Sequence, residues 1–307
     1  METFLQQIIN GLVLGSIYAL VALGYTMVYG ILGLINFAHG EVVMIGALTA
    51  LTVIKLLANS GLPGIVVVLL GLAAAVPVCM ALGFTIERVA YRPLRNAPRL
   101  APLITAIGVS IVLQQLAMIF WGRNYHAFPP ILPTSSREIG GAHITDVQIV
   151  IILLAVAIMA GLMLLVNRTR LGRAMRATAE NPQIAGLMGV NINVIISATF
   201  LIGSALAAVA GVMVSANYSI AHYHMGFILG LKAFTAAVLG GIGNLPGAML
   251  GGVLLGLIES LGAGYIGDLT GGFLGSHYQD VFAFFVLILV LVFRPSGLMG
   301  EKVAERA

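Results

Sequence analysis

Long apolar stretches separated by short polar connections run along most of the chain. A transmembrane helix needs about 20 predominantly apolar residues. The stretches that reach or approach this length lie near residues 6–32, 35–57, 64–86, 100–121, 148–167, 193–216 and 280–294. This pattern predicts an all-α polytopic membrane protein with about eight transmembrane segments, some of them broken or re-entrant. We expect residues 1–307 to form a single transmembrane domain.

Residues 230–261 form a further apolar stretch that is interrupted by "GGIGNLPG", from Gly240 to Gly247. Each half of this stretch is too short to cross a bilayer comfortably. Non-helical backbone at membrane depth is tolerated where it is buried in protein or lines a cavity. We therefore expect a re-entrant hairpin or a pair of half-helices here.

A second interruption is "LINFAHGEVV", from Leu34 to Val43, which carries ionisable groups inside an apolar run. One interpretation is a polar helix boundary close to the cytoplasmic surface. The other is a helix break that exposes backbone groups to a water-filled pathway, because intramembrane ionisable groups usually face a cavity or a partner. One break in each half of the chain favours the pathway, since transporters built from repeats bind substrate between half-helices.

A zwitterionic amino acid suits such breaks. Its carboxylate would lie near a helix N-terminus, its ammonium near exposed carbonyls and its aliphatic side chain against apolar walls. Glu41 and Glu259 are the acidic candidates near this path, although Glu259 also fits a helix end held by interfacial water. The predicted pathway residues are Asn36, His39, Gly40, Glu41, Gly241, Gly243, Asn244 and Gly247.

Composition excludes a water-soluble protein. Of the chain, 60% is hydrophobic and only 8% is charged, whereas soluble domains carry roughly a quarter charged residues. The 38 glycines fit close helix packing in a membrane bundle. A single cysteine, Cys79, excludes an intramolecular disulfide and most cysteine-based metal sites. The N-terminal stretch lacks a basic region and a cleavage site, so we expect a first span and not a removed signal peptide.

Arginine placement predicts the orientation. The positive-inside rule puts arginine-rich loops in the cytoplasm, and only 122–147 among the longer connections is poor in arginine. We therefore expect 122–147 and the N-terminus outside and the C-terminus inside, which requires 230–261 to cross zero or two times. The arginines of the two cytoplasmic loops are Arg88, Arg92, Arg95, Arg99, Arg168, Arg170, Arg173 and Arg176, and Arg294 and Arg306 join them at the C-terminus.

The loop 167–192 is too long for a simple turn and too polar to be buried in lipid. Pro182 is expected to split it into two short helices. One interpretation is an amphipathic segment on the membrane surface, whose arginines meet anionic head groups. The other is a docking element for a cytoplasmic partner, with Arg173, Arg176 and Glu180 at its rim.

The sequence carries no catalytic or metal-binding pattern. His39, Gly40 and Glu41 do not form an H-E-x-x-H motif, and His222 and His224 are two residues apart and are interpreted as solvated loop residues. The chain also lacks G-x-x-x-x-G-K-[ST], so a separate subunit would have to supply any ATPase. A self-contained alternative is an ion- or proton-coupled secondary transporter with His39 and Glu41 as a proton relay. A membrane-embedded hydrolase is less favoured, because no nucleophile–base pair is present.

Four ordered motifs carry a resemblance to a known family. They are "YALVALGYTMVYGILGLINFAHGEVVMIGA", "ERVAYRPLR", "RLGRAMRATAENPQIAGLMGVN" and "LKAFTAAVLGGIGNLPGAMLGGVLLGLIES". Together they closely resemble the permease subunits (LivH-type) of bacterial high-affinity branched-chain amino-acid ABC transporters, over nearly the whole chain. The resemblance implies a non-enzymatic importer subunit that translocates leucine, isoleucine and valine across the bacterial inner membrane. Relatives of this family also carry urea, amides and other amino acids, which remain alternative substrates.

The resemblance also implies the partners. They are a homologous second permease subunit in a heterodimer, two cytoplasmic ATPase subunits, a periplasmic solute-binding protein and the lipid membrane, with no nucleic acid. No cofactor or metal is expected on this chain, and ATP and Mg²⁺ belong to the ATPase subunits. Residues 172–190 match the family's coupling helix, which sits in a groove of the ATPase. The coupling residues expected there are Gly172, Arg173, Arg176, Glu180, Asn181, Gly186, Leu187, Met188 and Gly189.

Overall fold

The computed structural model describes residues 2–95, 97–98, 100–129, 135–271, 278–294 and 296–300, and Arg99 and Arg306 lie outside them. The long helices are α1 (Glu2–Leu32), α2 (His39–Leu57), α3 (Gly64–Ile86), α4 (Leu100–Trp121), α5 (Asp146–Arg168), α8 (Ile192–Tyr218), α9 (Met225–Gly240), α10 (Leu245–Leu269) and α11 (Gln279–Phe293). The short elements are η1 (Glu87–Tyr91), η2 (Arg92–Leu94), α6 (Arg170–Glu180), α7 (Pro182–Leu187), β1 (His126–Ala127), β2 (Ser136–Ile139), β3 (Ala142–Thr145) and β4 (Ile220–Ala221).

The predicted polytopic all-α architecture is confirmed. Among the described residues, seven helices are long and apolar enough to cross a membrane, and α9 and Phe284–Phe293 are shorter apolar helices. The prediction that each half of 230–261 is too short to cross is wrong for α10, which has 25 residues. Its last turns contain small and polar residues that lower the local hydropathy but continue the helix to Leu269.

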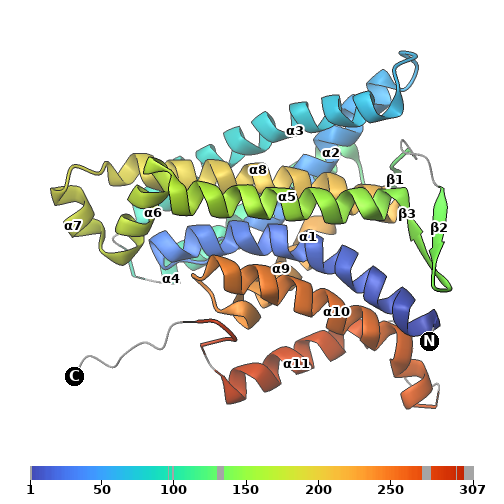
Figure 1. Ribbon diagram of the computed structural model, residues 1–307. Helices are drawn as coiled ribbons and strands as arrows, with labels where there is room; N and C mark the ends of the chain where they lie inside the picture. The colour runs from blue at the N-terminus through green and yellow to red at the C-terminus, as the bar shows by residue number, and fades with distance from the viewer. Residues whose placement is uncertain are drawn as a thin grey trace.

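Helix α1 lies at the centre of the bundle, against α8, α9 and α10 (Figure 1). Its contact with α10 is close because glycines on both helices leave no side chain between the backbones. A Cβ atom added at Gly15 would lie 2.7 Å from the Cα of Val253, and one added at Gly256 would lie 2.2 Å from the backbone nitrogen of Gly15. Small residues spaced four apart allow membrane helices to approach in this way. Part of the glycine content therefore serves close helix packing, as we expected from the composition.

The loops lie at two opposite ends of the bundle and are grouped as arginine placement predicts. Figure 1 shows α6 and α7 at one end and the N-terminus with the β2–β3 hairpin at the other. Gln6 on α1 exchanges two hydrogen bonds with the backbone of His143 on β3 (2.9 and 2.7 Å). At the opposite end, Arg95 Nη1 donates to Asn193 Oδ1 at 2.6 Å. The arginine loops therefore share one end, the cytoplasmic end by the positive-inside rule.

The connection 122–147, expected only as a polar loop, contains short strands. Strands β2 and β3 pair antiparallel with Ser136 opposite Thr145. Strand β1 pairs with β4, which follows α8, and His126 lies opposite Ala221. The two-residue and four-residue strands are too short to give a recognisable alternation in sequence. They tie the outer loops to one another.

Candidate functional site

The first break lies between α1 and α2. Helix α1 ends at Leu32, and Gly33 follows with φ +62°, a left-handed conformation that glycine adopts easily. Asn36 lies in the connection, where its buried Oδ1 accepts a hydrogen bond from the hydroxyl of Tyr91 at 3.2 Å. The same hydroxyl bonds the carbonyl of Ile35. The break is thus held against the cytoplasmic end of the α3–η1 segment.

His39 and Glu41 begin α2, and they contact different helices. The His39 ring packs edge-on against Tyr25 of α1 with 4.9 Å between ring centroids. Glu41 is fully buried, and its Oε1 accepts hydrogen bonds from Ser110 Oγ (3.0 Å) and Gln114 Nε2 (2.7 Å) of α4. Residues two apart on a helix point to different sides. Among the described residues no hydrogen bond joins His39 to Glu41.

Gly40 lies at a close crossing of α2 and α9. A Cβ atom added at Gly40 would lie 2.4 Å from the carbonyl oxygen of Gly226 and 2.9 Å from the Cα of Gly230. Two backbones thus meet where the sequence suggested an opening. Within this chain the 34–43 stretch is a packed polar centre, and its polar side chains face other helices.

The second break separates α9 from α10 and is confirmed in position. Gly241 and Gly243 have φ +110° and +93°, values that non-glycine residues rarely adopt. Asn244 Oδ1 accepts a hydrogen bond from the backbone N–H of Gly247 at 2.9 Å, which caps α10. Asn244 Nδ2 donates to the carbonyl of Met299 at 2.9 Å, so this asparagine also fastens the C-terminal segment to the break.

The second break and the cytoplasmic loop meet at one small cavity of about 90 Å³. Gly243 lines it from the break, Gly30 from α1, and Met175 and Arg176 from α6. The structure thus brings together predicted residues of the pathway and of the coupling loop that are far apart in sequence. The structure also places the break between α9 and α10 at the cytoplasmic end. If α9 spans the bilayer, the chain therefore crosses it twice between α8 and α11.

The loop 167–192 folds as the two short helices predicted from Pro182. Thr169 caps α6 by accepting from the N–H of Gly172 (3.0 Å), and Asn181 caps α7 by accepting from Gln183 and Ile184. Gly172 is buried against α5, where an added Cβ would lie 2.2 Å from the carbonyl oxygen of Val166.

The exposed side of the 167–192 loop is partly apolar. Leu187 is 87% exposed and Met188 is 81% exposed, beside Gly189 with φ +86°. The side chains of Arg173 and Glu180 are also exposed. Arg176 instead turns back to the end of α5, where it donates to the carbonyl of Val166 and to Asn167 Oδ1. Gly186 is an exposed residue of α7, and α7 lies at the far end of the molecule (Figure 1).

A second charged centre was missed in the sequence. Lys232 Nζ lies 2.7 Å from Glu259 Oε1 and 2.7 Å from Asp280 Oδ1. Tyr18 OH donates to Glu259 Oε2 at 2.9 Å. These residues come from α9, α10, α11 and α1. The available signal was a lysine inside an apolar stretch, because such residues are rare in membrane segments and are usually functional.

The position of Glu259 settles an alternative left open above. Glu259 is 1% exposed and lies well inside α10, ten residues before its end. The interpretation of Glu259 as a helix-end residue held by interfacial water is therefore wrong. Its negative charge is compensated by Lys232 and by the Tyr18 hydroxyl, which is what permits a carboxylate to be buried there.

Lys232 and Tyr18 border a cavity of about 370 Å³ at the outer end of the bundle. Its walls include the aliphatic side chains of Leu14, Ile17 and Leu229. A cavity of this kind can hold a small molecule with one aliphatic part, and its charged border can orient a carboxylate or an ammonium group.

Aromatic side chains surround the outer part of this cavity. Tyr125, Tyr218 and His222 line it, and the His222 ring packs edge-on against Tyr125 at 4.7 Å. Burial lowers the pKa of the His222 imidazole from its ordinary value, and the neighbouring His224 lowers it further. His222 is therefore neutral at pH 7. It is half-buried and not the solvated residue that the sequence suggested.

Metal chemistry finds no support in the described part of the chain. Among those residues, no three His, Cys, Asp or Glu side chains come together in a way that could hold a metal ion. The buried thiol of Cys79 bonds the carbonyl of Val42 at 3.4 Å.

Comparison with known proteins identifies the family. Residues 7–291 match the model described as "Branched-chain amino acid transport system / permease component". The chain is 50% identical to the high-affinity branched-chain amino acid transport system permease protein BraD of Pseudomonas aeruginosa, over 99% of this chain and 98% of that protein. It is 46% identical to the permease protein LivH of Escherichia coli K12, over 99% of this chain and 97% of that protein.

More distant relatives cover similar lengths. A probable branched-chain amino acid transport permease protein LivH of Methanocaldococcus jannaschii is 28% identical over 95% of this chain and 91% of that protein. No solved structure matches the chain. The chain is a multi-pass inner-membrane protein and the permease component of a transport system. With its extensive matches and its membrane-spanning fold, the chain belongs to the family of permease components of branched-chain amino acid transport systems.

Proposed function

We propose that this chain is the membrane subunit of an ATP-driven importer that moves leucine, isoleucine and valine across the inner membrane. The observation that carries the proposal is the outer cavity, where aliphatic walls adjoin the Lys232–Glu259 pair and Tyr18. A branched-chain amino acid has an aliphatic side chain and a carboxylate, and this cavity offers apolar walls for the first and the ammonium of Lys232 for the second. The names of the full-length relatives supply the substrate class.

In this proposal the substrate moves from the outer cavity toward the cytoplasmic cavity beside Gly243. The predicted residues of the second break, Gly241, Gly243, Asn244 and Gly247, form its inner end. The predicted residues of the first break do not bind the substrate in this proposal. They hold the helices beside the pathway in position. Gly40 allows α2 and α9 to approach closely, and the contacts of Asn36, His39 and Glu41 hold α2 against α1, η1 and α4.

Transport is coupled to ATP hydrolysis through α6 and α7. The exposed Leu187 and Met188 give this loop an apolar contact surface, and Arg173 and Glu180 lie near it. Movement of α6 would reach the substrate path directly, because Met175 and Arg176 line the same cavity as Gly243. Gly172, Asn181, Gly186 and Gly189 set the shape of the loop through packing, capping and turns.

The partners in this proposal are a homologous second permease, two ATPase subunits that bind ATP and Mg²⁺, and a periplasmic solute-binding protein. The ATPase subunits dock at the α6–α7 end, and the solute-binding protein docks at the end with the β2–β3 hairpin. No cofactor on this chain and no nucleic acid takes part. Support comes from the family description, which names one component of a transport system.

A proton-coupled secondary transporter is the second candidate, and the geometry disfavours it. A relay needs its groups within hydrogen-bonding reach of one another or of a bridging water. His39 contacts Tyr25 of α1, whereas Glu41 bonds to Ser110 and Gln114 of α4. Among the described residues no hydrogen bond joins the two groups. The loop 167–192 also favours the importer, because a self-contained transporter has no need of a docking element.

The test is reconstitution of the purified system in liposomes. Uptake of labelled leucine is measured with all subunits and ATP, without the ATPase subunits, and with this chain alone under a proton gradient. We expect uptake in the first arm only, with competition by isoleucine and valine but not by urea or amides. Uptake by this chain alone would contradict the importer, and preferential competition by urea or amides would contradict the substrate class.

The coupling loop has its own test. Leu187→Asp removes apolar burial worth about 1.5–3 kcal/mol if the side chain is covered by a partner. We expect reduced ATPase recruitment and lost substrate-stimulated hydrolysis, with the fold of the permease unchanged because the residue is exposed. The matched control is Leu62→Asp in the turn between α2 and α3, which is exposed and lies outside both the membrane-spanning helices and the 167–192 loop, so it should leave ATPase recruitment unaltered. Wild-type ATPase recruitment by Leu187→Asp would mean that this loop is not the coupling element.

A further inference from the structure

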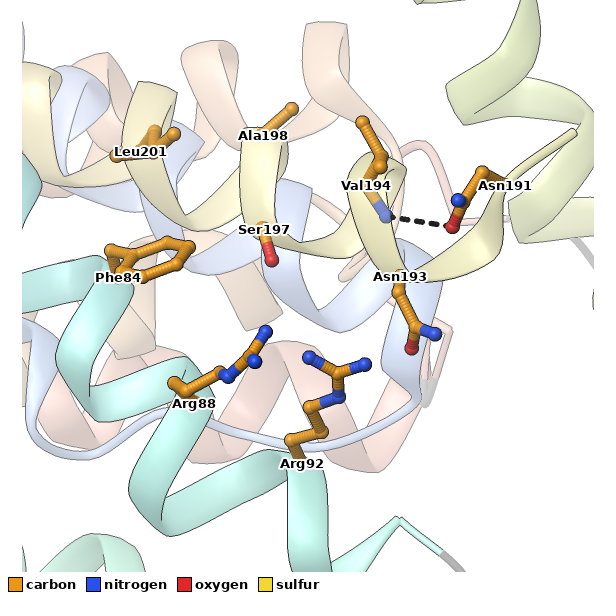
Figure 2. Close-up of a pocket in the computed structure, with 9 residues that line it drawn as sticks. All are labelled: Phe84, Arg88, Arg92, Asn191, Asn193, Val194, Ser197, Ala198 and Leu201. Atoms are coloured by element: carbon orange, nitrogen blue, oxygen red, sulfur yellow. Dashed lines mark hydrogen bonds between the residues drawn. The ribbon is translucent and has the colours of Figure 1, made fainter.

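A cavity of about 430 Å³ lies at the cytoplasmic end, between the end of α3 and the start of α8, and its lining contains none of the pathway and coupling residues named above. Figure 2 shows Arg88 and Arg92 on one side and the first turns of α8 on the other. The two arginines are four residues apart on the helical continuation of α3, which places them on the same face. In Figure 2 their guanidinium groups lie near one another and are directed toward α8.

The cavity carries a positive charge that the described residues do not compensate. Glu87 is the carboxylate nearest in sequence, and it is used by an ion pair with Arg95 and by a hydrogen bond from Ser197 Oγ at 2.8 Å. Among the described residues, neither Arg88 nor Arg92 takes part in an ion pair. The N-terminal end of α8 adds a partial positive charge. Like charges held together in this way favour an anion between them.

The other walls of the cavity are apolar and lie deeper in the membrane. Phe84 precedes Arg88 by one helical turn, and Ala198 and Leu201 follow the polar start of α8. Leu201 lies eight residues beyond Asn193, a distance of roughly 12 Å along a helix. The cavity is therefore cationic at the level of the cytoplasmic head groups and apolar at the level of the upper acyl chains.

We propose that this cavity binds an anionic phospholipid of the cytoplasmic leaflet. The phosphate would lie between the guanidinium groups of Arg88 and Arg92, and an acyl chain would run along Phe84 and Leu201. Arginine suits this role because its planar fork can bind two phosphate oxygens at once. A free phosphate ion would use the charges but not the apolar wall, so the lipid accounts for both features.

The bound lipid would join two segments that the sequence keeps far apart. Arg88 and Arg92 follow α3, whereas the opposite wall begins α8 directly after the α6–α7 loop. A lipid between them would anchor the base of this loop to the membrane. The proposal therefore concerns a lipid site of the fold and is independent of which solute is transported.

The test measures lipid retention by the full-length chain with native mass spectrometry. The probes are dioleoyl phosphatidylglycerol and dioleoyl phosphatidylcholine, which have the same acyl chains and differ in charge. We expect the wild type to retain phosphatidylglycerol preferentially. Each basic residue near an anionic membrane surface contributes about fivefold to binding, so R88Q/R92Q should weaken this retention roughly thirtyfold.

The matched control is R168Q/R170Q, which removes two exposed arginines from the same end but not from the cavity. It should retain phosphatidylglycerol as the wild type does. A second variant, Leu201→Trp, keeps both guanidinium groups and fills the place of the acyl chain, and it should also lose the lipid. Equal retention by R88Q/R92Q and the wild type would overturn the proposal.

Two further arms separate other occupants. Inorganic phosphate at millimolar concentration should not displace the lipid, and displacement would reduce the cavity to a phosphate site. Addition of the partner subunits should leave the lipid in place. If they displace it, and if R88Q/R92Q then fails to bind them, the cavity is a protein interface and the lipid proposal is wrong.

Discussion

Two charged centres are buried in this chain, one around Glu41 and one around Lys232 and Glu259, and different kinds of neighbour stabilise their charges. Glu41 lies among neutral donors, Ser110 and Gln114, in a region where helices touch backbone to backbone. Lys232 lies between the carboxylates of Glu259 and Asp280, and it borders an open cavity. A carboxylate held by neutral groups in a closed site suits structural support. An ion pair beside a cavity suits binding, because it can exchange one partner for a charged solute.

The largest effect is expected from Lys232→Met, which removes the cation from the second centre. Glu259 would stay buried without its partner, and breaking a buried ion pair from one side costs about 3–5 kcal/mol. Thermal unfolding in detergent and leucine uptake should both decline strongly. The double variant Lys232→Met/Glu259→Gln removes the fully buried carboxylate and leaves only the partly exposed Asp280 without its cation, so it should recover much of the stability but not the uptake. Recovery of uptake as well would show that this ion pair has no role in binding.

The next effect is expected from Gly40→Leu in the closed region. The new side chain would collide with the backbone of Gly226 and Gly230 on α9. Overpacking of this kind typically costs about 1–3 kcal/mol, so assembly and thermal stability should fall together with uptake. Gly108→Leu on α4 is a matched control, since an added Cβ there meets nothing within 4 Å. Loss of uptake with full stability would instead indicate an open pathway at Gly40.

A smaller effect is expected from Gln114→Leu, which removes one of the two donors to Glu41. A hydrogen bond to a charged group contributes about 1.5–3 kcal/mol, and less when a second donor remains. We expect a moderate decrease in melting temperature. Gln115→Leu changes the same residue type at the adjacent, exposed position and should be neutral. Equal melting temperatures for the two variants would mean that Glu41 does not depend on α4.

The smallest effect is expected from Glu41→Gln, which keeps the shape and removes the charge. The amide can still bond with Ser110 and Gln114, so the change in stability should stay within about 1 kcal/mol. Uptake should fall only in part. Glu259→Gln is the informative comparison, because it weakens an ion pair with Lys232 and should cost more. If Glu41→Gln proves the more harmful of the two, the roles assigned to the two centres are reversed.

Several features of the site could be predicted because they depend on local rules. Pro182 cannot continue a helix, and the preceding Asn181 is a good cap, so the division between α6 and α7 was visible in the sequence. The break between α9 and α10 was visible in the glycines and in Pro246 for the same reason. The hydrogen bond from Asn244 to the carbonyl of Met299 joins residues 55 apart in sequence, so it was not predicted. The bonds of Arg176 to the end of α5 depend on how α6 turns back against α5, which the sequence pattern does not specify.

The sequence by itself determined the membrane-spanning helices other than α10, the sites of their interruption and the end of the bundle to which each loop belongs. Hydropathy, backbone conformation and arginine placement act over short distances, so they can be read along the chain. Only the tertiary structure decided what each buried charge meets. Tyr18 and Glu259 are 241 residues apart, and Ser110 lies 69 residues from Glu41. Such pairs arise from the way helices pack, and apolar helices of similar hydropathy carry no local signal that specifies which of them will be neighbours.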